Sequence, residues 1–113
     1  MIKDIHQWKI YSSPMHRCLL TASEVSKGFQ NKSVFVHPQL FESDGCYRVN
    51  PDGTTEGLRG MSKEEVEERF PHFSCLPGME AGWFHLNHKE TRKEFYERTL
   101  QVVDFLWQEH ERI

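Results

Sequence analysis

The chain has 113 residues, enough for one domain and too few for two independent cores. Lys and Arg total 14 and Asp and Glu total 17, a net charge of 14 − 17 = −3, which argues against a nucleic-acid partner. No apolar run approaches the roughly 18–20 residues that span a bilayer, and the first residues contain no signal-type segment, so we expect a cytoplasmic protein without a membrane partner.

The first part of the chain predicts a strand, a helix and a second strand. Residues 8–11 are short and apolar, as at the end of a strand. Either serine of Ser12-Ser13-Pro14 can cap a helix that has Pro14 in its first turn and runs to about residue 27. Gly28 is expected to end this helix in the left-handed backbone conformation. Residues 33–37 predict a short strand that ends at Pro38. The predicted packing residues of the helix are Leu19, Leu20, Ala22 and Val25.

Two irregular stretches flank a short helix in the middle of the chain. Residues 42–60 hold four glycines and an Asn-Pro-Asp run, which predicts a long loop that is either functional or disordered. Ser62 and Glu65 form an S-x-x-E capping box, so a helix begins there and ends before Pro71. Residues 71–88 predict a second irregular stretch.

The last helix has the clearest pattern. Thr91 and Glu94 form a T-x-x-E capping box, and a helical pattern continues to about residue 110. Its apolar surface is wide, so this helix needs neighbours on more than one side. The stripe at helical spacing comprises Phe95, Thr99, Val102, Val103, Leu106 and His110, widened by Leu100, Phe105 and Trp107.

This element order predicts a single α/β layered domain over residues 1–113, with three main helices. Two visible strands cannot cover three helices, so we expect an incomplete sheet.

Two charged residues stand where α/β proteins place ligand-binding groups. Arg17 comes early in a helix that follows a strand, where the helix dipole and a guanidinium can hold an anion such as phosphate. Glu42 follows the second strand and could act as a general acid. By spacing alone, Arg17 can equally be a surface arginine and Glu42 a solvated loop residue.

Histidine and cysteine patterns indicate no metal or disulfide. The seven histidines include no H-x-x-x-H pair, and His85 and His88 lie in a loop without partners at zinc spacing. His16 lies beside Arg17, but adjacent helix positions point in different directions. The three cysteines lie far apart, so reduced, partly buried thiols are expected. We predict no metal and no cofactor.

Several segments together resemble one family. Residues 11–22 match the pattern S-S-P-x-x-R-x-x-x-T-A, and residues 36–42 resemble a strand that leads to an acidic residue. Residues 57–65, followed by Phe70 and Pro71, resemble a G-x-x-G-[LM]-[ST] insertion helix. Residues 82–84 and 94–109 fit the same branch. From about residue 9 to 108, the chain resembles the phosphatase-like branch of the histidine phosphatase superfamily, the phosphoglycerate-mutase-like proteins.

The resemblance implies a three-layer α/β/α phosphoglycerate-mutase-like fold and phosphoryl transfer through a phosphohistidine. In the family, an R-H-G motif supplies the nucleophile and a later H-G motif the second histidine. Phosphate binding then falls to Arg17, and protonation of the leaving group falls to Glu42. The sequence contains no R-H-G motif and no strand ending in H-G, and neither His16 nor His110 stands in those places.

The resemblance also implies a partial domain over residues 1–113. In the family the nucleophile strand lies in the middle of the sheet, so its absence would uncover apolar faces around Leu19 and on the last helix. The chain is accordingly expected to be marginally stable or to self-associate through the incomplete sheet.

Three functional hypotheses follow, and the sequence leaves open whether this chain is an enzyme. The first hypothesis is that the chain is the central part of a histidine phosphatase. The complete protein would hydrolyse a phosphomonoester, and this chain alone would be inactive. The alternative is a non-catalytic, degenerate relative that binds a phosphorylated ligand or a protein partner. The third is a small α/β interaction module. The substrate is not diagnosed, and specificity is expected in residues 45–60 and around Trp83.

Overall fold

Three short parallel strands form the centre of the structure, a computed structural model that describes residues 8–111 and, at 110 and 111, the backbone alone. The start of the chain, where no signal segment is predicted, and the His110 side chain lie outside the described part. The elements in chain order are β1 Ile10–Ser12, α1 His16–Gly28, β2 Val34–Val36, β3 Tyr47–Val49, β4 Thr55–Gly57, α2 Lys63–Arg69, β5 Phe73–Cys75 and α3 Arg92–Glu111.

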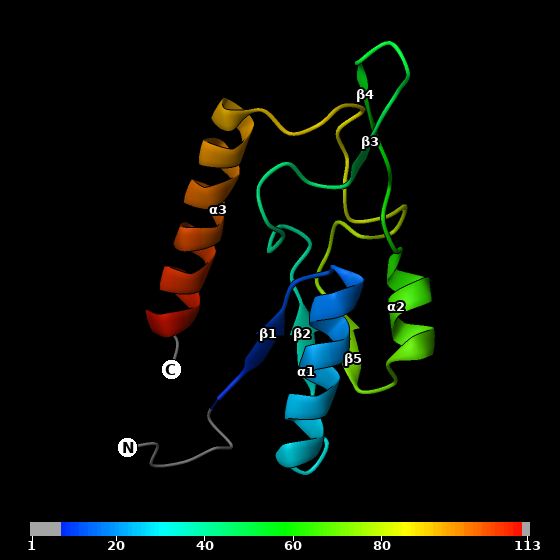
Figure 1. Ribbon diagram of the computed structural model, residues 1–113. Helices are drawn as coiled ribbons and strands as arrows, with labels where there is room; N and C mark the ends of the chain where they lie inside the picture. The colour runs from blue at the N-terminus through cyan, green and yellow to red at the C-terminus, as the bar shows by residue number, and fades with distance from the viewer. Residues whose placement is uncertain (1–7, 112–113) are drawn as a thin grey trace.

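The parallel sheet, in the order β1-β2-β5, separates two helical layers (Figure 1). Val34 and Val36 of β2 are fully buried on the face covered by α1 and α2, where they share one core with Leu19 and Val66. Because side chains alternate along a strand, Tyr11 points to the other face, where its ring lies 5.6 Å from that of Phe105 in α3. The chain therefore has the α/β class that was predicted, with helices on both faces of a small sheet.

The structure has more strands than the sequence indicates. The predicted loop over 42–60 contains an antiparallel hairpin, β3 and β4, whose turn is the Asn-Pro-Asp-Gly run. Asn50 and Thr54 close this turn by a backbone hydrogen bond of 2.8 Å. The predicted irregular stretch 71–88 begins with β5, which pairs with β2. Each of these strands has three residues, too few for an alternation of apolar and polar residues to reveal it.

Helix α1 differs at both ends from the prediction. Its N-cap residue is Met15, and neither Ser12 nor Ser13 caps the helix with its side chain. The Ser13 hydroxyl instead accepts a hydrogen bond from the Met15 N–H. Gly28 lies within the helix, and the left-handed residues follow it at Gln30 and Asn31. Among the predicted packing residues, Leu19 and Ala22 are buried, whereas the prediction was wrong for Leu20 and Val25, which are exposed.

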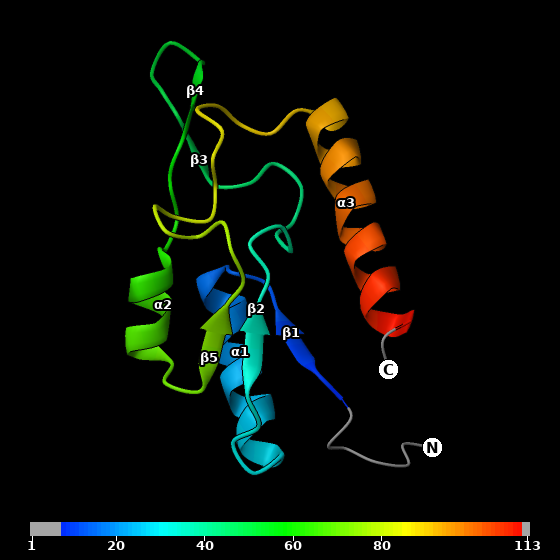
Figure 2. The ribbon, with the colours of Figure 1, turned by 180° about the vertical axis from the view of Figure 1, so that it is seen from behind.

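Both predicted capping boxes are present. Ser62 and Glu65 exchange hydrogen bonds at the start of α2, and Thr91 and Glu94 do so before α3. Helix α3 nevertheless contacts the rest of the protein along one narrow side only, and it stands apart at the edge of the molecule in Figure 2. The half-buried positions on that side include Arg98, Thr99, Val102, Phe105 and Glu109.

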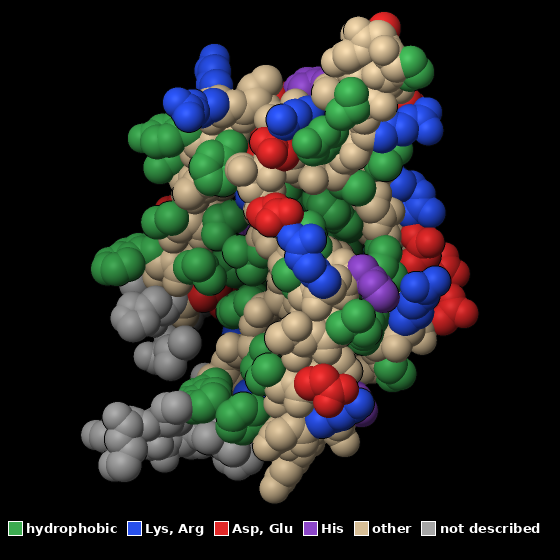
Figure 3. Space-filling view, viewed as in Figure 1, with side chains coloured by type: hydrophobic (Ala, Val, Ile, Leu, Met, Phe, Trp, Pro, Cys, Tyr) green, Lys and Arg blue, Asp and Glu red, His purple; other side chains and the backbone are tan. Residues whose placement is uncertain are grey.

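The expected uncovered apolar surface is found on α3, whereas Leu19 of α1 is fully buried. Hydrophobic side chains gather over α3 in the space-filling view (Figure 3). The exposed large residues of this helix are Phe95, Tyr96, Leu100, Val103, Leu106 and Trp107. The predicted stripe is therefore only partly used for packing, since Phe95, Val103 and Leu106 belong to the exposed set.

Candidate functional site

Arg17 and Glu42, predicted separately from the sequence, lie in contact. Arg17 is the second residue of α1, and Glu42 lies in the segment that follows β2. An Arg17 Nη2 atom lies 2.7 Å from Glu42 Oε1. Both residues follow the carboxyl ends of adjacent parallel strands, the edge at which open α/β sheets bind ligands.

The Arg17–Glu42 pair is open to solvent. The two side chains are 65% and 62% exposed. The hydrogen bond and the charge of Glu42 raise the pKa of the Arg17 guanidinium, which therefore stays positively charged. Because an ion pair in water is weak, an incoming anion can compete with the carboxylate for this guanidinium.

The backbone at the start of α1 adds to the positive character of this edge. The first N–H groups of a helix have no acceptor within it, and the helix dipole favours an anion there. The Ser13 hydroxyl accepts from the Met15 N–H, one residue before the helix. Arg17 thus extends from a helix end that itself favours a phosphate group.

A cavity of about 650 Å³ lies on the other side of the segment that bears Glu42, between α3 and the segments that follow β2 and β5. Its walls include the aromatic rings of Phe41, Trp83 and Phe105. A smaller hollow, of about 360 Å³, shares Phe41 and Arg98 with this cavity and reaches Glu42. Of the two regions in which specificity was predicted, Trp83 lines the larger cavity and residues 45–60 do not.

His37 lies directly after the carboxyl end of β2. It is 7% exposed and lines the cavity. Burial lowers its pKa, so the ring is neutral near pH 7. Its Nδ1 accepts a hydrogen bond from the Gln39 N–H at 3.1 Å, and its ring stacks edge-on with Phe105. A neutral ring fixed in this way supplies polarity to the wall but no positive charge for an anion.

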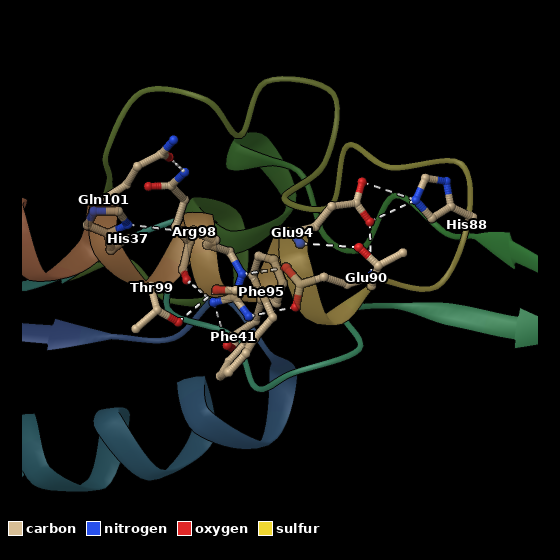
Figure 4. A network of polar contacts seen from close by, with 11 residues as sticks. His37, Phe41, His88, Glu90, Glu94, Phe95, Arg98, Thr99 and Gln101 are labelled. Atoms are coloured by element: carbon tan, nitrogen blue, oxygen red, sulfur yellow. Dashed lines mark hydrogen bonds and ion pairs between the residues drawn. The ribbon is translucent and has the colours of Figure 1, made fainter.

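A buried ion pair joins Arg98 to Glu90, two residues that the sequence did not indicate as functional. The Arg98 guanidinium donates to both Glu90 oxygens, at 2.7 and 2.9 Å, as Figure 4 shows. The two side chains are only 10% and 2% exposed. A signal was available, because an arginine interrupts the apolar side of α3 between Phe95 and Val102, and a buried arginine needs a partner.

The remaining histidines and cysteines carry no reactive arrangement in the part of the chain that the structure describes. The His16 ring lies 6.5 Å from that of Phe70, and His88 bonds to Glu94 beside the α3 capping box. All three thiols are free and half-buried, as predicted, and burial raises the pKa of Cys75 to about 11. Among the side chains that the structure describes, those of residues 8–109, no three metal-ligating groups converge. No helix within residues 8–111 is long and apolar enough to span a membrane.

Comparison with known proteins gives one match. The family model of the histidine phosphatase superfamily (branch 1) matches residues 1–113, the whole chain. No curated protein and no solved structure matches the chain. The family assignment therefore rests on the sequence pattern across the full length of the chain.

Proposed function

The chain belongs to the histidine phosphatase superfamily, and on that premise we propose that it forms the central part of a phosphomonoester hydrolase acting through a phosphohistidine. Arg17 binds the phosphate and Glu42 protonates the leaving group. The observation that carries the proposal is the 2.7 Å contact between these two side chains at the carboxyl edge of the parallel sheet.

The ion pair suggests how the two roles follow one another. A phosphate dianion that approaches the start of α1 competes with Glu42 for the Arg17 guanidinium, which can hold phosphate by two parallel hydrogen bonds. Glu42 is then released from Arg17 and lies beside the bound phosphate ester. A protonated carboxyl beside a phosphate ester can give its proton to the departing oxygen, which otherwise leaves poorly as an alkoxide.

The covalent step needs a nucleophilic histidine, and no R-H-G motif stands in this sequence. We therefore propose that this 113-residue stretch has no turnover of its own on a generic phosphomonoester. Turnover that survives purification and disappears in Arg17→Ala and Glu42→Gln would overturn that part of the proposal. In a longer version that contains both histidine motifs, Glu42→Gln should slow turnover strongly without weakening phosphate binding.

Phosphate binding tests the proposal on the chain itself. Inorganic phosphate is titrated into the labelled protein while amide and arginine side-chain NMR signals are followed. The Arg17 and His16 signals should shift, Arg17→Ala should abolish the shifts, and Glu42→Gln should strengthen binding because it removes the competing carboxylate. Arg48→Ala is the matched control, since Arg48 forms another solvent-exposed pair, with Glu56, also at 2.7 Å. Equal losses in Arg17→Ala and Arg48→Ala would refute the phosphate site.

The alternative, a non-catalytic relative that binds a phosphorylated ligand or a protein partner, is favoured by the missing R-H-G motif. It shares the phosphate site and differs in the size of the native protein. An antibody against this segment should detect a heavier chain in cells if the hydrolase proposal is right. A native species of 13.4 kDa, the mass of these 113 residues, would support the non-catalytic relative.

A further inference from the structure

We infer that Arg98 and Glu90 are positioning residues that hold Glu42 beside Arg17. This inference rests on the proposed function, because it assigns a role to the surroundings of the proposed proton donor. The segment between β2 and β3 that bears Glu42 contains no regular secondary structure. The carboxylate itself is 62% exposed, so its exposed ion pair is a weak anchor.

Arg98 is hydrogen-bonded to this segment just before Glu42. Its Nη1 donates to the carbonyl oxygens of Gln39 and Phe41, at 2.8 and 2.9 Å. The guanidinium also lies over the Phe41 ring, with its central carbon 3.7 Å from the ring centroid (Figure 4). Two carbonyls and one ring of a single short segment are thereby fixed to one side chain of α3.

Glu90 is hydrogen-bonded to the segment just after Glu42. Its backbone N–H donates to the carbonyl of Asp44 at 2.9 Å, and its carboxylate holds the Nε and Nη2 atoms of Arg98. The backbone of Glu42 is therefore held on both sides by one buried ion pair. The Glu42 side chain reaches Arg17 at the start of α1.

The planar guanidinium explains why this position is an arginine. Arg98 makes four hydrogen bonds in different directions while its face stacks on Phe41. A lysine can keep the charge opposite Glu90, but its single ammonium lacks the planar fork and cannot make this set of bonds together. Arg98→Lys therefore keeps the positive charge opposite Glu90 but removes the hydrogen bonds to the Gln39 and Phe41 carbonyls.

A double-mutant cycle read out on Arg17 tests the inference without phosphate. Glu42→Gln should shift the Arg17 Nε–H NMR signal in the otherwise unchanged chain, because it removes the charge 2.7 Å away. In the Arg98→Lys background the same substitution should shift that signal by less than about half as much. Backbone order parameters of residues 39–44 should fall there as well, while those of α1 and β2 stay near 0.85.

Glu109→Gln is the matched control, since it removes another contact of α3, the ion pair with Lys9, far from Glu42. It should leave the Arg17 shift unchanged even if it lowers stability. If Arg98→Lys does not fold, Arg98→Met combined with Glu90→Leu provides the second test, because it removes the donor to the Gln39 and Phe41 carbonyls without leaving a buried charge. An undiminished Arg17 shift in a folded Arg98 variant would overturn the inference. A failure of phosphate binding alone would count against the proposed function and leave the positioning role standing.

Discussion

Glu90→Ala should destabilise the protein strongly, because it leaves the Arg98 guanidinium charged and without its partner where only 10% of its side chain is exposed. The substitution removes two charge-assisted hydrogen bonds of 2.7 and 2.9 Å. Breaking a buried ion pair by removal of one partner costs about 3–5 kcal/mol. Small domains have a total stability of only about 5–15 kcal/mol, so the loss is a large share of it.

Urea unfolding at pH 7, followed by tryptophan fluorescence and circular dichroism, measures this loss. With an m-value of about 1–3 kcal/mol/M, the midpoint should fall by at least ~1 M. Glu56→Ala is the control, since it removes the partner of Arg48 from a pair of the same 2.7 Å length that is exposed. That control should lose less than ~1 kcal/mol. Similar losses in the two variants would refute the reasoning from burial.

A double replacement separates the ion pair from the bonds to the backbone. Glu90→Leu with Arg98→Met removes both charges, and such apolar replacements of buried pairs often restore stability. Here the carbonyls of Gln39 and Phe41 would still lose their donor. Recovery should therefore stop short by about 1–3 kcal/mol, the penalty for a buried acceptor without a partner. Complete recovery would mean that the grip on the backbone contributes nothing.

Three further predictions concern pH and association. Burial lowers the pKa of His37, so the unfolded chain binds this proton more tightly than the folded chain does. As the pH is lowered below about 6.5, the urea concentration at the unfolding midpoint should therefore decrease in the wild type, and decrease less in His37→Gln. The pKa of Glu65 is lowered to about 2, chiefly by Arg59, so its stabilising contribution should vanish as the pH falls from 4.5 toward 2, and acid titration of Glu65→Gln should lack that component. We also propose that the exposed apolar surface of α3 drives self-association, so light scattering should show a mass that rises with concentration and falls in Leu100→Lys/Val103→Lys. A wild type that stays monomeric with a concentration-independent melt would contradict this last expectation.

The sequence predicted the features that depend on neighbouring residues. Both capping boxes occur where the S-x-x-E and T-x-x-E spacings place them, because each needs only residues three apart. The contact between Arg17 and Glu42 could be expected from their places after two strands, since parallel strands bring their carboxyl ends to one edge. The 2.7 Å separation itself depends on how the segment after β2 is held.

The features that were missed depend on residues far apart in the chain. Strand β5 is a strand because its backbone pairs with β2, and three residues carry no pattern of their own. Leu20 fits the apolar pattern of α1 yet is 51% exposed, because the sheet covers only one side of that helix. The partners of Arg98 are Glu90 and two carbonyls of the segment after β2, and no spacing rule links α3 to that segment.

The two helical layers contribute different groups to the site. Helix α1 packs on one face of the sheet and carries the cation, whereas the buried pair at the start of α3 holds the carboxylate from the other side. The backbone that bears Glu42 is tied to α3 before it and to Glu90 after it, so a displacement of the first turns of α3 would move Glu42 relative to Arg17. Much of the apolar surface of α3 is exposed. If the proposed phosphate site and the positioning role both hold, a partner that displaced α3 would alter the competition between Glu42 and phosphate for Arg17 without touching either residue.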